Sequence, residues 1–292
     1  MSESFRYSDD ELATLPAVYA PDLLKGQVFV VSGGGSGIGR ATAWLAARLG
    51  AKVVVTGRKE EKLVAMRDGL TAHGFSADYA MLDIRDRDSV DGALTRIMAR
   101  EGRIDTLVNS AGGQFPQAAI DYSLKGWRAV IETNLDGTFH MMQSMARLWR
   151  DKGAGGNIVN IVVSGRGLHH VAHSVAARAG VIAFSEAVAV EWAPLGIRIN
   201  CIAPGAIRSE GWATYAPDVR ERYPNTNPLR KVGTPWDVAQ ACIYLSAPSG
   251  QFVTGETLEI TGGGHLWGEV WTTDKPGYFI DASRKIEPKA SE

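Results

Sequence analysis

The residues best suited to chemistry near the start of the chain are the glycines of the segment Gly33 to Gly39, which reads Gly-Gly-Gly-Ser-Gly-Ile-Gly. The apolar run Val28 to Val31 precedes them, and a helical pattern that stops at Gly50 follows. Glycine lets backbone N–H groups approach a phosphate, and a helix N-terminus adds free donors and a favourable dipole. A further apolar run, Val53 to Val55, completes a strand–helix–strand unit. This order favours a pyrophosphate site of a dinucleotide over a plain glycine turn.

Two cations stand where the second strand of that unit ends. The sequence there is Val55-Thr56-Gly57-Arg58-Lys59, without the Asp or Glu that an NAD-binding protein places on the ribose hydroxyls. A guanidinium can bind a 2′-phosphate with two hydrogen bonds, whereas a carboxylate would repel it. We therefore predict NADP(H) as the cofactor, with Arg58 and Lys59 on its 2′-phosphate. The alternative is that both cations are solvated residues at a helix start.

The elements that must position these residues alternate along the chain as strand and helix without a linker. We expect strands at 28–31, 53–56, 77–82, 104–109, 157–163, 198–202 and 257–260, and helices at 38–49, 59–73, 88–101, 125–149, 174–193 and from Thr234 onward. This order predicts an α/β fold with one doubly wound parallel sheet in a single domain, and ligands at the carboxyl ends of its strands.

The remaining segments are expected to lie around that domain. Residues 1–25 are predicted to form a polar N-terminal arm over the surface, 26–264 the sheet domain, and 265–292 a C-terminal extension rich in aromatic residues. Residues 206–232 are the least regular part and follow the sixth strand. Because loops at that place overhang a bound cofactor, we interpret them as a substrate lid, with an ordinary surface insertion as the alternative.

Composition excludes several classes of function. The 292 residues carry 31 basic and 32 acidic side chains, so no overall field points to nucleic acid or an acidic membrane. No apolar run reaches the length that a membrane span needs, and the polar start Met1 to Ser4 is not a signal peptide. Two cysteines, Cys201 and Cys242, form neither a disulfide framework nor a metal-ligand pattern. We expect a cytoplasmic protein without a metal site.

Several motifs in order resemble the short-chain dehydrogenase/reductase family. The glycine turn is similar to the family's T-G-x-x-x-G-x-G with Ser32 in place of threonine, Asn109 to Gly112 is similar to N-N-A-G, and Asn134 and Ala203-Pro204-Gly205 match two further motifs. The resemblance covers residues 26–264 and implies a Rossmann fold and often a homotetramer. It also implies a set of cofactor-binding residues, namely Gly33, Ser36, Gly37, Ile38, Gly39, Asp83, Ile84, Asn109, Ala111, Gly112, Arg178, Pro204, Gly205 and Ile207.

The catalytic positions of that family depart from its usual pattern. Members that reduce carbonyls or oxidise alcohols carry Y-x-x-x-K, in which tyrosine exchanges a proton and lysine lowers its pKa. Here Ser174 occupies the tyrosine position and Arg178 the lysine position, while Val163 stands where a strand-five serine is expected and Ser164 follows it. A serine hydroxyl has no acidity near neutrality and an arginine essentially keeps its proton, so the usual acid–base pair is missing.

One branch of the family tolerates this loss. Segments such as Gly113-Gln114-Phe115, Lys125-Gly126-Trp127 and the run from His173 to Gly180 resemble peroxisomal trans-2-enoyl-CoA reductase and, more distantly, the 2,4-dienoyl-CoA reductases. The resemblance implies an acyl-CoA thioester as substrate and hydride delivery from NADPH to its conjugated double bond. The charge then develops on the thioester oxygen as an enolate, which needs hydrogen-bond donors. Those implied are Asn134, Ser174 and Ser164, with Arg178 on the nicotinamide ribose.

Two other functions stay open from the sequence. The chain could be an alcohol or carbonyl oxidoreductase that uses His173, Tyr215 or Tyr223 as its acid–base, or a catalytically silent NADP-binding protein. His169 and His170 lie near the expected substrate entrance, but they lack a third ligand for a metal.

Overall fold

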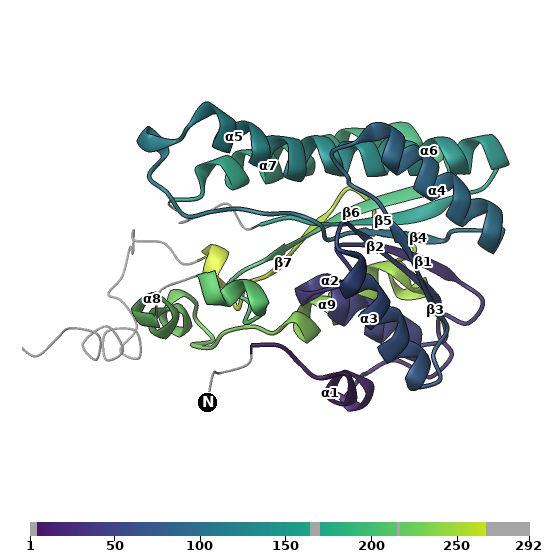
Figure 1. Ribbon diagram of the computed structural model, residues 1–292, viewed down its shortest axis with the longest axis horizontal. Coiled ribbons are helices and arrows are strands. Elements are labelled where there is room, and N and C mark those ends of the chain that lie inside the picture. Colours follow the sequence, from purple (N-terminus) through teal and green to yellow (C-terminus); the bar gives the residue numbers. More distant parts are fainter. Residues whose placement is uncertain (1–4, 164–169, 215–216, 267–292) are drawn as a thin grey trace, which may run out of the picture.

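The computed structural model describes residues 5–163, 170–214 and 217–266, and within them seven parallel strands form one sheet in the order β3-β2-β1-β4-β5-β6-β7. The predicted doubly wound parallel sheet is confirmed (Figure 1). The strands are β1 Val28–Ser32, β2 Lys52–Gly57, β3 Ala77–Met81, β4 Thr106–Asn109, β5 Gly156–Ile161, β6 Ile197–Pro204 and β7 Thr257–Ile260.

Helices cover both faces of this sheet (Figure 1). Helices α4 (Arg87–Glu101), α6 (Gly137–Lys152) and α7 (Ala172–Trp192) lie on one face, and α2 (Gly37–Arg48), α3 (Glu60–Ala72) and α9 (Pro235–Ser246) lie on the other. Strand β1 therefore faces two hydrophobic cores, with Phe29 and Val31 in one and Val30 in the other. Burial on both faces explains why the strands read as continuous apolar runs rather than as alternating patterns.

The order of the strands reverses between β1 and β4, which places a crevice at their carboxyl ends. Ser32 at the end of β1 is in register with Thr56 of β2 and with Asn109 of β4. Asn109 is in turn in register with Asn160 of β5, and its side-chain Nδ2 donates to Asn160 Oδ1 at 2.8 Å. The loops that leave these strand ends therefore share one edge of the sheet, where ligands of such folds bind.

The prediction of one continuous helix over residues 125–149 is wrong in one respect. The chain forms α5 (Leu124–Ile131), then a π-helical turn over Glu132–Asp136, and then α6. A π-helical turn inserts one extra residue into the helical repeat, and such turns occur frequently at functional sites. Asn134, which the sequence singled out, lies inside this turn and is buried.

Residues 5–25 are more closely attached than a polar arm over the surface would be. They form a short helix α1 (Asp9–Thr14), which begins with a capping box between Ser8 and Glu11. Leu12 and Leu24 are buried in the core on the α2 side of the sheet. Two long-range hydrogen bonds hold the following chain, from Trp236 Nε1 to Pro16 O at 2.8 Å and from Tyr19 Oη to Gln240 O at 2.6 Å.

The segment 206–232 contains short helical turns over Glu210–Thr214 and Tyr223–Thr226 and a helix α8 (Pro217–Arg222). The predicted helix start at Thr234 is confirmed, because Thr234 and Asp237 form a capping box. Helix α4 begins one residue before the expected 88, with Asp86 as its N-cap. Ser164, His169, Tyr215 and residues 267–292 lie outside the described residues.

One segment, Ala172–Leu195, is long and apolar enough to cross a membrane by length and composition, contrary to the expectation from sequence. In the fold it is α7 with the turn that follows, it packs on the sheet, and 44% of its most apolar window is buried. The core helix of a parallel sheet meets the same criterion of length and hydropathy because it is buried against apolar strands.

Candidate active site

The glycine turn joins β1 to α2 and packs closely on the loop that follows β4. Gly33 has a φ of +70°, and a Cβ built on it would lie 2.7 Å from Ala111 N. A Cβ on Gly39 would lie 2.5 Å from Gly33 O. At these two positions the turn has no room for a side chain, and the backbone of α2 begins directly at the edge of the crevice.

The first turn of α2 offers backbone donors to that crevice. Its N-cap residue, Ser36, makes no side-chain capping bond, and the first helical N–H bond is that of Arg40 to Ser36 O at 3.0 Å. The N–H groups of Gly37, Ile38 and Gly39 precede it and have no partner within the helix. One of them, Gly37 N, donates to Glu210 Oε2 at 2.8 Å. These donors form an anion site of the kind that binds a pyrophosphate.

Asn134 links the loop after β4 to helix α7. Its Oδ1 accepts from Gly113 N at 2.9 Å, and its Nδ2 donates both to Gly113 O at 2.9 Å and to Ser174 Oγ at 3.2 Å. Both amide hydrogens of Asn134 are therefore engaged, so the side chain has no donor left for a substrate. Its position fixes the loop. The Ser174 hydroxyl accepts this bond and donates to no described residue, so its own hydrogen can donate to a ligand.

Arg178 lies one helical turn beyond Ser174, on the same face of α7. It is buried, its Nη2 donates to Ala111 O at a long 3.4 Å, and its Nη1 has no hydrogen-bond partner among the described residues. Burial lowers the pKa of Arg178 from its ordinary value to about 10, so the guanidinium is charged at neutral pH. A buried cation without a carboxylate partner is costly, and such groups concentrate at functional sites.

Gly112 completes the contact between the β4 loop and this cation. A Cβ at Gly112 would lie 2.0 Å from Arg178 Nη2 and 3.0 Å from Asn134 Oδ1. Only a glycine at this position lets the guanidinium lie against the loop. The three side chains of Asn134, Ser174 and Arg178, which the sequence placed in one site, are thus brought together by the fold.

An aromatic group lies beside Ser174. The ring of His173 stacks on Tyr122 with centroids 4.5 Å apart and an angle of 8°, and it meets Phe115 edge-on at 4.5 Å. Burial is the main cause that lowers the pKa of His173, so the ring is neutral at pH 7. Its Nδ1 accepts from Ser174 N at 2.7 Å, and neither its Nε2 nor Tyr122 Oη has a partner in the described part of the chain. A neutral imidazole in this tautomer donates a hydrogen bond but is a poor acid.

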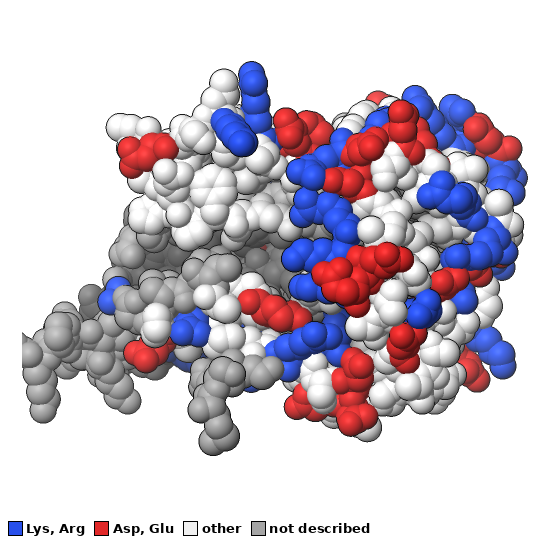
Figure 2. Space-filling model, viewed as in Figure 1, with Lys and Arg blue, Asp and Glu red and all other residues white. Residues whose placement is uncertain are grey.

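The residues expected around the adenosine end lie on the loops after β2 and β3. Arg58 and Lys59 are exposed, with Lys59 at the N-cap of α3. Figure 2 shows Lys and Arg side chains running down the middle of one face, with Asp and Glu side chains beside them. The Asp83 carboxylate accepts from Arg85 Nη2 at 2.5 Å, and this hydrogen bond is the main cause that lowers the pKa of Asp83. Ile84 is buried and packs on Gly137 at the start of α6.

The other end of the crevice is closed by the turn after β6. Pro204 is the last residue of β6, and Gly205 N donates to Ile260 O of β7 at 3.0 Å. Two residues later, Ile207 pairs with Gly233 in an isolated parallel bridge. The segment 206–232 is therefore anchored at both ends beside the carboxyl ends of β6 and β7.

Among the described residues, no group of three His, Cys, Asp or Glu side chains could hold a metal ion.

Comparison with known proteins identifies the family. The family described as Enoyl-(Acyl carrier protein) reductase matches residues 33–265. The peroxisomal 2,4-dienoyl-CoA reductase of Arabidopsis thaliana, (3E)-enoyl-CoA-producing, is 35% identical over 265 residues, which cover 85% of this chain and 87% of that protein. The chain belongs to the short-chain dehydrogenase/reductase family.

Two further relatives show how broad this short-chain dehydrogenase/reductase family is. The 3-oxoacyl-acyl-carrier-protein reductase FabG of Escherichia coli is 34% identical over 244 residues, covering 83% of this chain and 98% of that protein. The structure of the citronellol catabolism dehydrogenase AtuB of Pseudomonas aeruginosa superposes with a TM-score of 0.76 at 37% identity, covering 85% of this chain and 99% of that one. Members of the family bind nicotinamide cofactors, so the chain is an oxidoreductase that uses NAD or NADP.

The residues of this short-chain dehydrogenase/reductase fit such a cofactor. A Cβ at Gly33 or Gly39 would meet backbone atoms of the turn and its neighbouring loop, Gly37 N in the first turn of α2 already binds a carboxylate, and the buried Nη1 of Arg178 has no hydrogen-bond partner among the described residues. Sequence reasoning did not find Glu210 or Tyr122 as parts of the site. Glu210 meets Gly37 across 173 residues of sequence, so no local pattern could reveal it, whereas Tyr122 could have been sought as an aromatic residue in the β4–α5 loop.

Proposed function

We propose that this short-chain dehydrogenase/reductase is an NADPH-dependent reductase of the carbon–carbon double bond in 2-enoyl thioesters. The observation that carries the proposal is the pair on one face of α7. Ser174 presents a hydroxyl hydrogen and Arg178 a charged Nη1, and neither has a pKa near neutrality. The site therefore supplies hydrogen-bond donors without supplying the proton-transfer group that carbonyl reduction requires.

Those donors suit a reaction whose charge appears on an oxygen. The reduced nicotinamide, when bound, supplies a hydride, which adds to the β-carbon of the conjugated thioester. The electron pair of the double bond then moves to the thioester oxygen as an enolate, and water protonates the α-carbon afterwards. The Ser174 hydroxyl donates to the enolate oxygen, and Asn134 holds that hydroxyl in place, because Nδ2 of Asn134 points at Ser174 Oγ.

Arg178 has two roles in this proposal. Its free Nη1 donates to the ribose hydroxyls beside the nicotinamide, and its charge stabilises an enolate formed within a few ångströms because the surroundings are buried. The aromatic group of Phe115, Tyr122 and His173 forms an apolar wall next to Ser174 that suits an acyl chain.

Likeness to the 2,4-dienoyl-CoA reductase supports an acyl-CoA substrate, whereas likeness to FabG favours carbonyl reduction as the second candidate. Carbonyl reduction needs a proton donor near pH 7, and His173 is the titratable ring that the described residues place in hydrogen-bond contact with Ser174, with Tyr122 stacked on its far side. Because burial keeps that ring neutral and its lone pair is taken by Ser174 N, the enoyl reaction accounts better for the site.

The test is NADPH oxidation with crotonyl-CoA and longer 2-enoyl-CoAs, measured beside 3-oxoacyl thioesters, ketones and aldehydes. We expect turnover of the enoyl thioesters, and a loss of about a hundredfold in kcat for Ser174→Ala, the usual effect of removing one oxyanion donor. Turnover of carbonyls without turnover of enoyl thioesters would favour the FabG-like reaction. Binding of nucleotide with no turnover on the whole panel would favour a silent NADP-binding protein.

The preference for NADPH rests on the exposed cations after β2. Replacing Arg58 by Asp should weaken NADPH binding by at least tenfold and NADH binding much less, because only NADPH carries the 2′-phosphate. Fluorescence titration of both nucleotides measures this preference. An unchanged ratio of the two dissociation constants would contradict the assignment of Arg58.

The cellular compartment and the oligomeric state are part of the same proposal. The two described cysteines, Cys201 and Cys242, are free and buried, which suits a reducing compartment such as the cytoplasm. The family resemblance and the exposed apolar side chain of Val190 on α7 support a homotetramer that packs through α6 and α7. Light scattering of the purified protein measures the assembly.

A further inference from the structure

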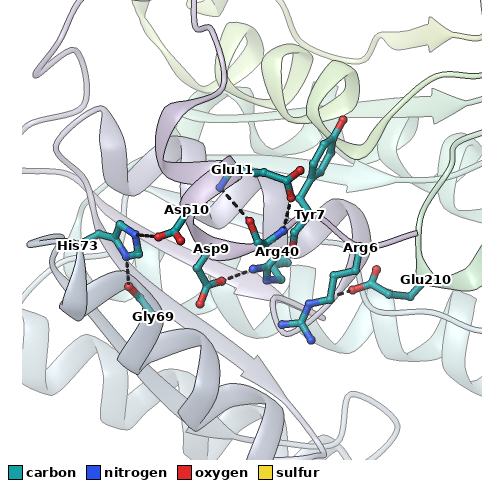
Figure 3. Close-up of polar contacts among 10 residues, drawn as sticks. Arg6, Tyr7, Asp9, Asp10, Glu11, Arg40, Gly69, His73 and Glu210 are labelled. Atoms are coloured by element: carbon teal, nitrogen blue, oxygen red, sulfur yellow. Dashed lines mark hydrogen bonds and ion pairs between the residues drawn. The ribbon is translucent and has the colours of Figure 1, made fainter. Parts of the chain in front are cut away.

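The carboxylate of Glu210 lies at the N-terminus of α2, where the pyrophosphate of a bound dinucleotide is also expected. It begins the helical turn Glu210–Thr214, six residues after β6 ends, and its Oε2 accepts from Gly37 N at 2.8 Å. Its Oε1 lies 3.7 Å from Nε of Arg6 in the N-terminal segment. Figure 3 shows the carboxylate of Glu210 facing Arg6, with Arg40 and Asp9 next to them.

The Gly37 amide is one of the donors at the N-terminus of α2. A helix N-terminus carries a partial positive charge, and the glycine turn leaves its amides open to the crevice. The pyrophosphate of a dinucleotide is expected on these same amides. A carboxylate on Gly37 N is therefore an internal anion placed at the pyrophosphate site, contributed by the segment after β6.

The surrounding charges explain why a carboxylate settles there. Arg40, one turn into α2, is buried, and burial is the main cause that lowers the pKa of its guanidinium. Arg6 lowers that pKa further, whereas Asp9 and Glu210 raise it. Asp9 forms an ion pair with Arg40, so the positive charge that Glu210 meets comes chiefly from Arg6 and the helix N-terminus, which together attract an anion that can reach them.

Steric crowding around Gly37 is not what holds the Glu210 carboxylate against its amide. A Cβ at Gly37 would lie 3.7 Å from Glu210 Oε2 and 3.7 Å from Ser209 Cβ, which is ordinary van der Waals spacing. The side chain of Glu210 is also 33% exposed, so it can leave Gly37 for solvent without disturbing the core. The carboxylate is held by charge and by one amide, and a diphosphate offers the same amides more negative charge.

We propose that Glu210 competes with the cofactor's pyrophosphate for the first-turn amides of α2 and thereby sets the affinity for dinucleotides. This inference rests on the proposed binding of a nicotinamide dinucleotide. Whether the carboxylate is displaced or stays beside the phosphates, its negative charge opposes theirs. Removing that charge therefore raises affinity for NADPH and NADH alike, because both carry the same pyrophosphate.

The test compares Glu210→Gln with Glu221→Gln. Glutamine keeps an oxygen that can accept from Gly37 N, so the variant removes the charge and preserves the contact. Glu221 is an exposed acid on α8 in the same segment, so its replacement changes the net charge equally at another place. Dissociation constants for NADPH and NADH are measured by fluorescence titration at about 0.05 M and about 1 M salt, and thermal melts check the fold.

We expect Glu210→Gln to bind both nucleotides about fivefold to tenfold more tightly than wild type at low salt, and Glu221→Gln to match wild type. The gain should shrink at high salt, because the screening length falls to about 3 Å at 1 M. Unchanged or weaker binding by Glu210→Gln would overturn the inference, and Glu210 would then be a fixed helix cap.

These outcomes are separate from those that test the proposed function. Equal binding by wild type and Glu210→Gln with turnover of enoyl thioesters would reject the competition and leave the proposed function standing. Tighter binding by Glu210→Gln without such turnover would support the competition and reject the enoyl reaction. If neither protein binds either dinucleotide, both proposals fall.

Discussion

Replacing Arg178 by methionine should make the nucleotide-free protein more stable, although it removes a charged group from the site. Burial lowers the pKa of Arg178 from its ordinary value to about 10. At about 1.4 kcal/mol for each pKa unit, this gap corresponds to roughly 3 kcal/mol by which the fold opposes the charge. Because the folded pKa lies below the unfolded one, the penalty is present in full below about pH 10 and is relieved only as the pH rises from there toward the ordinary pKa of arginine.

Methionine fills a similar volume with an uncharged side chain, and among the described residues it loses one hydrogen bond, the long 3.4 Å bond from Arg178 to Ala111 O. We therefore expect a gain of about 1–3 kcal/mol at pH 7, which is a rise of several degrees in melting temperature for a chain of this size. The same substitution should weaken NADPH binding by at least about tenfold, because the free Nη1 is lost.

Arg198 provides the matched control. Burial also lowers the pKa of Arg198, but its guanidinium donates to Gly250 O at 2.7 Å, to Val253 O at 3.0 Å and to Leu245 O at 2.9 Å. Arg198→Met leaves these three carbonyl groups without their donor and should lower stability by about 1–3 kcal/mol. Thermal and urea unfolding without nucleotide measures both variants. A less stable Arg178→Met would refute the reasoning that this cation is buried without compensation.

Two further changes probe the contacts around the site and the N-terminal segment. Gly112→Ala should raise the dissociation constant for NADPH by at least about tenfold, because the new Cβ would lie 2.0 Å from Arg178 Nη2. The control Gly113→Ala, whose Cβ would have no atom within 4 Å, should bind NADPH as wild type does in the same fluorescence titration. Asp10→Asn should lower the melting temperature slightly near pH 5.5 and not near pH 8.5. The pKa of His73 is raised, first by Gly69 O and then by Asp10, so this stabilisation is present below the ordinary pKa of histidine and lost above the raised one. Equal melting differences at both pH values would contradict that account.

The sequence by itself determined the order of the elements. Apolar runs bounded by glycine and cap residues are local signals, so the seven strands, the glycine turn after Ser32 and the helix start at Thr234 could all be read from neighbouring residues. Asn134, Ser174 and Arg178 could be assigned to one site because a family pattern connects them. The loss of the usual acid–base pair, with Ser174 and Arg178 at the tyrosine and lysine positions, could also be read from the sequence, since side-chain acidity depends first on residue type.

The tertiary structure decided what those residues can do. The π-helical turn at Asn134 depends on packing rather than on periodicity, and it directs both amide hydrogens of that side chain to partners inside the protein. The burial of Arg178 and its orphan Nη1 exist only where the β4 loop lies against α7. The contact of Glu210 with Gly37 joins residues 173 positions apart. Local sequence patterns specify helices and strands because the hydrogen bonds of a helix and the spacing of apolar residues involve neighbouring positions. Burial and charge contacts depend instead on which helices, strands and loops the fold brings together.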